Sequence, residues 1–104
     1  MTGFTKVAKT GEVLEGQAKV FEAGDTRVLL CRVNGEVCAI ADVCTHDGGP
    51  LGEGDLDGHE IICPRHGARF DVRTGAVLSF PAIVPVDSYA VKIDGDDVLV
   101  QLNE

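Results

Sequence analysis

Long apolar runs and an excess of basic residues are both missing from this sequence. No apolar run approaches the roughly 18 residues that a membrane-spanning helix needs. The first residues also lack a charged and then apolar secretory signal, so we expect a cytoplasmic protein with no membrane segment. Lysine and arginine number 9 against 17 aspartates and glutamates, which gives a net charge of −8. Nucleic-acid binding needs a basic face, so this charge argues against a nucleic-acid partner.

Sustained helical periodicity is missing as well. Short segments rich in β-branched and aliphatic residues recur about every 8 to 12 residues instead, with turn residues between them. This pattern predicts a single all-β domain over residues 1–104, built as a β-sandwich or a partly open barrel. The expected strands are residues 5–9, 17–22, 27–33, 36–42, 60–63, 69–72, 76–78, 88–93 and 98–102.

The four cysteines are not spaced as the framework of a disulfide-rich protein. Cys31 and Cys38 flank Asn34-Gly35, which is a strong signal for a two-residue hairpin turn. Counting back from this turn places the two thiols opposite each other on one face of the hairpin. In a reducing cytoplasm we expect them to be small apolar core side chains, and a regulatory disulfide is the alternative.

Metal-ligand chemistry is concentrated in two segments, Cys44-Thr45-His46 and Cys63-Pro64-Arg65-His66-Gly67. Thiolate and neutral imidazole bind borderline metals, so the four groups could fill one tetrahedral shell or serve two irons. A zinc finger of the usual kind has both cysteines before both histidines, whereas each segment here holds one of each. Each loop could therefore give its cysteine to one iron and its histidine to another, as in a Rieske 2Fe–2S centre.

These two segments resemble the ligand motifs of the Rieske iron–sulfur family. The similarity covers roughly residues 36–102 and extends to Asp47-Gly48-Gly49-Pro50-Leu51, Arg69-Phe70-Asp71 and Thr74-Gly75. It is closest to the ferredoxin components of bacterial ring-hydroxylating dioxygenase systems. The resemblance implies an all-β base, a β-sandwich or partly open barrel, with a small cluster-binding subdomain at about residues 42–82 inserted between hairpins.

The resemblance also implies one 2Fe–2S cluster as the cofactor. Cys44 and Cys63 would hold the inner iron as thiolates, and His46 and His66 would hold the outer iron through their δ nitrogens. The two imidazoles would then be the exit for the electron. His59 matches no ligand position, and we expect it to be a surface residue.

The function implied by the resemblance is that of an electron carrier and not of an enzyme. It would take electrons from a NAD(P)H-dependent flavin reductase and pass them to a terminal non-haem iron, aromatic-ring-hydroxylating oxygenase. Ala68 and Phe70 replace two hydroxyl donors of high-potential family members, which predicts a potential toward the low end of about −150 to +300 mV. Residues 80–85 are expected to cover one side of the cluster, and Arg65 and Arg69 either contact a partner or are solvated.

Two other classes of function remain open at this point. One is a small electron-transfer subunit of another oxidoreductase, such as nitrite reductase. Small nitrite-reductase subunits of this family often lack the ligands, whereas all four are present here, which weighs against this alternative. The other is a structural or redox-sensing metal module, for example one that binds zinc.

Overall fold

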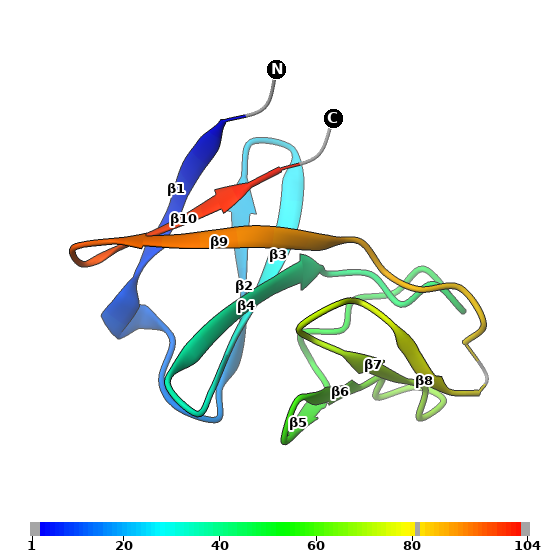
Figure 1. Ribbon diagram of the computed structural model, residues 1–104. Coiled ribbons are helices and arrows are strands. Elements are labelled where there is room, and N and C mark those ends of the chain that lie inside the picture. The colour runs from blue at the N-terminus through cyan, green and yellow to red at the C-terminus, as the bar shows by residue number, and fades with distance from the viewer. Residues whose placement is uncertain (1–2, 81, 103–104) are drawn as a thin grey trace.

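Two antiparallel sheets make up the computed structural model, which describes residues 3–80 and 82–102 (Figure 1). The larger sheet has six strands in the order β1-β10-β9-β4-β3-β2, and the smaller has four in the order β5-β6-β7-β8. A single 3₁₀ turn, η1 (Thr10–Glu12), follows the first strand in the described part of the chain. The strands are β1 (Phe4–Lys9), β2 (Ala18–Ala23), β3 (Thr26–Val33), β4 (Glu36–Ala41), β5 (Asp55–Asp57), β6 (Glu60–Ile62), β7 (Arg69–Asp71), β8 (Val77–Ser79), β9 (Ser88–Asp94) and β10 (Asp97–Gln101).

The six-stranded sheet forms a nearly closed barrel, because β1 and β2 lie at opposite ends of the strand order and still contact each other. Its register is set in part by the turn between β3 and β4, where Asn34 and Gly35 have φ angles of 54° and 79°. These left-handed conformations are typical of a type I′ hairpin turn. The turn pairs Cys31 with Cys38, as the sequence predicted. The predicted fold class, all-β with a partly open barrel, is confirmed.

The four-stranded sheet lies in the chain between β4 and β9, two neighbouring strands of the barrel. Figure 1 shows its strands, coloured green to yellow, beside the barrel and not within it. Long connections lead from β4 into this sheet and from it back to β9. The segments that carry the Cys/His motifs belong to this insertion, so they are attached to the barrel through β4 and β9.

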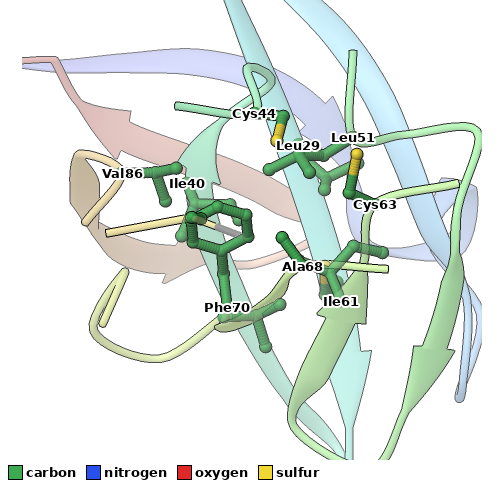
Figure 2. Close-up of a cluster of buried hydrophobic side chains, with 12 residues drawn as sticks. Leu29, Ile40, Cys44, Leu51, Ile61, Cys63, Ala68, Phe70 and Val86 are labelled. Atoms are coloured by element: carbon green, nitrogen blue, oxygen red, sulfur yellow. The ribbon is translucent and has the colours of Figure 1, made fainter. Parts of the chain in front are cut away.

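Strand β3 contributes to two hydrophobic cores, one on each of its faces. Val28 and Leu30 point into the barrel core with Val98 and Val100. Leu29 and Cys31 belong to a second cluster, which we call the inter-sheet core because it joins the barrel to the small sheet. Figure 2 shows this cluster around Phe70, and its buried members are Leu29, Cys31, Ile40, Cys44, Leu51, Ile61, Cys63, Ala68, Phe70, Val72, Ala82 and Val86. Burial on both faces explains why residues 28–31 are continuously apolar.

Nine of the ten strands begin and end within one residue of the predicted positions. The prediction missed β5, because its acidic residues suggested an exposed loop. In the structure Leu56 pairs with Ile61, while the flanking Asp55 and Asp57 are exposed. No helix in the described part of the chain is long and apolar enough to cross a membrane.

Candidate metal centre

The two Cys/His segments form loops with the same backbone hydrogen bonds, which we call the first (44–49) and second (63–68) cysteine loops. In each, the cysteine carbonyl accepts a hydrogen bond from the N–H of a glycine four residues later, Gly48 or Gly67, at 2.6 and 3.0 Å. The N–H of Cys44 or Cys63 donates in turn to the carbonyl five residues later, at 2.7 and 2.8 Å. Both glycines have a positive φ, 76° and 79°, which side-chain-bearing residues rarely adopt. A cysteine followed four residues later by a glycine is the sequence pattern that the two loops share, and the sequence analysis did not single it out.

The two loops bring the sulfur atoms of Cys44 and Cys63 together at the edge of the inter-sheet core. Both cysteines are buried, and Figure 2 shows their sulfurs next to Leu51 at one end of the cluster. The two sulfurs and one carboxylate oxygen of Asp47 all lie within 4.8 Å of one another. Burial raises the pKa of the Cys44 thiol, so a metal that binds there must displace a proton.

The two histidines lie on the outer side of the same loops. Both are exposed, and their ring centroids are 5.1 Å apart with the ring planes at 88°. This edge-to-face arrangement holds His46 and His66 as a pair, although they are 20 positions apart in the chain. The structure therefore brings the four predicted residues to one place, with sulfur on the inside and imidazole on the outside.

This arrangement fits a two-iron centre better than a single metal ion. With metal–ligand bonds of about 2.0 to 2.3 Å, a tetrahedral site needs four ligand atoms within about 4 Å of each other. In residues 3–80 and 82–102, the one group of metal-ligand side chains within 4.8 Å contains the two cysteines and Asp47 but neither histidine. The carboxylate of Asp47 is already engaged, by the N–H of Gly49 at 2.9 Å and by Arg65 at 2.6 Å. Two sulfurs for one iron and two imidazoles for a second are compatible with these positions.

Arg65 and Arg69, which were expected to contact a partner or to be solvated, both form ion pairs within the chain. Arg65 pairs with Asp47 of the first cysteine loop and holds the pKa of that carboxyl well below its usual range. Arg69 pairs with Asp57 at 3.2 Å and with Glu60 at 3.1 Å, which raises the pKa of the guanidinium.

Asp42 is a buried carboxylate that the sequence analysis did not identify. It follows β4 directly, and one of its oxygens accepts hydrogen bonds from the backbone N–H groups of Leu51 at 2.9 Å and Gly52 at 2.7 Å. Its other oxygen pairs with Arg27 at 2.9 Å. Asp42 thus joins the start of the first cysteine loop to the segment that leaves it. The hairpin register set by Asn34-Gly35 places Arg27 opposite Asp42, but no local sequence signal reveals the contacts with Leu51 and Gly52.

The segment 80–85 was expected to cover one side of the cluster, and Pro81 within it lies outside the described residues. Its attachment to the site is clear, because the hydroxyl of Thr45 donates to the carbonyl of Val84 and Ala82 is buried in the inter-sheet core. The side chains of Phe80 and Ile83, however, are 78% and 75% exposed. The segment therefore lies against the first cysteine loop but leaves much of its apolar surface in solvent.

The remaining cysteines and His59 are placed as predicted. Cys31 and Cys38 are free thiols opposite each other on β3 and β4, and burial raises the pKa of Cys31 to about 12. His59 lies in the turn between β5 and β6, is partly exposed, and uses its carbonyl to accept the N–H of Val72.

Comparison with known proteins is consistent with this geometry. The model of the Rieske 2Fe-2S domain matches residues 3–90. The chain is 42% identical over 98 residues to the ferredoxin component of biphenyl 2,3-dioxygenase from Rhodococcus jostii strain RHA1, covering 94% of this chain and 92% of that protein.

Solved structures give the same result. The ferredoxin of carbazole 1,9a-dioxygenase from Nocardioides aromaticivorans IC177 superposes with a TM-score of 0.89 at 35% identity, covering 93% of this chain and 95% of that one. A chain from a complex of reduced oxygenase and oxidized ferredoxin in carbazole 1,9a-dioxygenase gives 0.87 at 33% identity, with 94% and 92% covered. The cofactor of this family is one Rieske-type 2Fe–2S cluster, as the sequence predicted, and the donor set described above fits it. The chain belongs to the Rieske 2Fe-2S domain family.

Proposed function

We propose that this protein is a Rieske ferredoxin, a one-electron carrier that delivers electrons to a terminal non-haem iron oxygenase. The single observation that carries this proposal is the layering of the site, with two buried sulfurs behind two exposed imidazoles. The relatives named as ferredoxin components of dioxygenase systems support it, because the similarity spans nearly the full length of both chains.

The proposed ligands are Cys44 and Cys63 for one iron and His46 and His66 for the other. The bound cluster supplies a site that gains and loses a single electron. The protein contributes the rest: the inter-sheet core keeps water from the sulfurs, and the exposed imidazoles offer a partner the shortest approach. With four protein ligands, the two irons of the cluster would have no coordination position open for a substrate. The chain itself therefore acts as a carrier.

The electron donor that we propose is a NAD(P)H-dependent flavin reductase, and the location is the cytoplasm. The low potential predicted from the sequence supports this choice of donor. Ala68, the last residue of the second cysteine loop, and Phe70, two residues beyond it, are buried and have no hydroxyl to donate toward a cluster sulfur. We also propose that residues 1–104 form one Rieske domain with its cluster-binding subdomain at about residues 42–82. The position of β5 to β8 between β4 and β9 supports this division.

Coupled turnover tests the proposal. The purified holoprotein would be mixed with a ring-hydroxylating dioxygenase reductase, NADH and a matching terminal oxygenase, and its visible spectrum followed without and with oxygen and substrate. We expect bleaching when the reductase is present and recovery of the colour when the oxygenase is added. A protein that the reductase cannot bleach, or whose reduced form the oxygenase does not reoxidise, would contradict the assignment.

A further inference from the structure

Arg65 belongs to the second cysteine loop but places its guanidinium on the first. Its Nε donates to Oδ2 of Asp47 at 2.6 Å, and its Nη2 donates to the backbone carbonyl of Pro50 at 2.9 Å. The side chain of Arg65 thus bonds both to Asp47 of the first cysteine loop and to Pro50, the residue that follows this loop. Charge-assisted bonds made by two nitrogens of one planar guanidinium also fix its direction.

The first cysteine loop has a surface shaped for this guanidinium. A Cβ atom on Gly49 would lie 2.5 Å from Cζ of Arg65, so only a glycine lets the guanidinium lie against the backbone at that point. Asp47, which receives Arg65, is itself held by the N–H of Gly49 at 2.9 Å. The carboxylate and the glycine of the first loop therefore form one receptor for the arginine of the second.

The pair is also partly shielded and lies near the sulfurs. The side chain of Arg65 is 31% exposed against 51% for Arg73 in the comparable pair with Asp71, while the carboxylates are similar, at 19% for Asp47 and 15% for Asp71. A carboxylate oxygen of Asp47 lies within 4.8 Å of both sulfurs, and the guanidinium of Arg65 is hydrogen-bonded to that carboxylate at 2.6 Å. Arg65 is therefore close enough to both cysteines for its charge to act on them.

We propose that Arg65 is a positioning residue for the cluster: through Asp47 and Pro50 it locks the two cysteine loops together and so keeps the four ligands in place. This inference rests on the ligand set given under the proposed function. A second consequence concerns charge. Reduction adds one negative charge to the site, so the arginine stabilises the reduced form and the aspartate stabilises the oxidised form.

Cluster retention is the first test, because a lock between the loops must slow the escape of iron. We would compare Arg65→Gln and Asp47→Asn with Arg73→Gln and Asp71→Asn, a matched ion pair whose two members lie in one turn and join no loops. The readout is the decay of the visible absorbance of the oxidised holoprotein in excess iron chelator. We expect about fivefold faster decay for each variant of the Arg65–Asp47 pair and no change for the control pair.

The reduction potential is the second test. A purely structural defect would not shift the midpoint potential in opposite directions in the arginine and the aspartate variants. Arg65→Gln should lower the midpoint potential and Asp47→Asn should raise it, each by more than the variant of the control pair with the same charge change. Equal decay rates in all four variants would overturn the lock. Shifts of the same sign in Arg65→Gln and Asp47→Asn would overturn the electrostatic part.

Gly49→Ala separates the lock from the charge. It should accelerate decay about fivefold where Arg65 is present and have little effect in the Arg65→Gln background, because the clash needs the guanidinium. Equal effects in both backgrounds would show that Gly49 does not serve Arg65. If the wild-type protein bound no pair of irons, the proposed ligand set would fail first, before these variants were made.

Discussion

The four cysteines form two pairs, and all four contact the same inter-sheet core. Cys31 and Cys38 face each other on neighbouring strands, where the sheet hydrogen bonds continue past them and their neighbours Leu29 and Ile40 are apolar. Cys44 and Cys63 face each other from two loops that turn back at a glycine and carry a histidine toward solvent. The comparison teaches that the backbone around a cysteine, and not the presence of two close thiols, distinguishes the two proposed ligands from the two core thiols.

The largest expected effect comes from removing one sulfur of each pair. We expect Cys63→Ser to lose the cluster, because the inner iron would keep a single thiolate. Cys38→Ser should retain it, because that thiol is part of the sheet. Iron per chain and visible absorbance measure both outcomes. Retention of two irons by Cys63→Ser, or loss from Cys38→Ser, would break the distinction between the pairs.

Asp42 is the first residue after β4, so it lies between the barrel strands and the first cysteine loop. Asp42→Ala leaves Arg27 and the N–H groups of Leu51 and Gly52 without their acceptor, and should lower the free energy of unfolding by about 3 kcal/mol. Chemical denaturation checks this value. Asp25→Ala, in the exposed turn between β2 and β3, is the matched control and should change it by less than about 0.5 kcal/mol. Similar losses in both variants would mean that the Asp42 contacts contribute little.

Two glycines allow the same backbone strain to be introduced into the hairpin of the core thiols and into a cysteine loop. Gly35 in the hairpin turn and Gly67 in the second cysteine loop both have a φ of 79° and open space at the Cβ position. Alanine should cost about 1 kcal/mol of strain at each. We expect Gly35→Ala to lower only the unfolding free energy, while Gly67→Ala also accelerates cluster loss into a chelator. An equal rate of cluster loss in the two variants would argue that the backbone conformation of the second cysteine loop does not hold the ligands in place.

The smallest effect concerns the pH dependence that the core thiol adds to stability. Because burial raises the pKa of Cys31 from 9.0 to about 12, the folded protein keeps a proton there that the unfolded chain releases. This contribution is complete below pH 9 and disappears as the pH rises toward 12, so unfolding should become easier over that window. Cys31→Val should show a flatter loss of unfolding free energy between about pH 8 and pH 10.5. Parallel curves for the two proteins would contradict the raised pKa.

The parts of the molecule that the sequence predicted are those fixed by local chemistry. Asn34-Gly35 determines a hairpin, and the hairpin pairs Cys31 with Cys38. The Cys/His segments with their glycines indicated the site, because each motif is complete within a few residues. Strand β5 was missed because the charges of Asp55 and Asp57 outweighed the single apolar Leu56 between them.

What remained out of reach depends on contacts between distant segments. The hairpin register already places Arg27 opposite Asp42, but Asp42 meets the N–H groups of Leu51 and Gly52 only after the first cysteine loop has formed. Arg65 meets Asp47 only after the two cysteine loops face each other, which no periodicity records. Such residues look like ordinary surface charges in the sequence, and the fold gives them their roles.

Electron paramagnetic resonance of the protein after dithionite reduction, with iron and zinc content measured on the same sample, tests the central claim most directly. The account predicts two irons per chain, no zinc, and a rhombic signal with the low average g value of mixed cysteine and histidine ligation. Zinc in place of iron, or a signal typical of a cluster held by four cysteines, would contradict it.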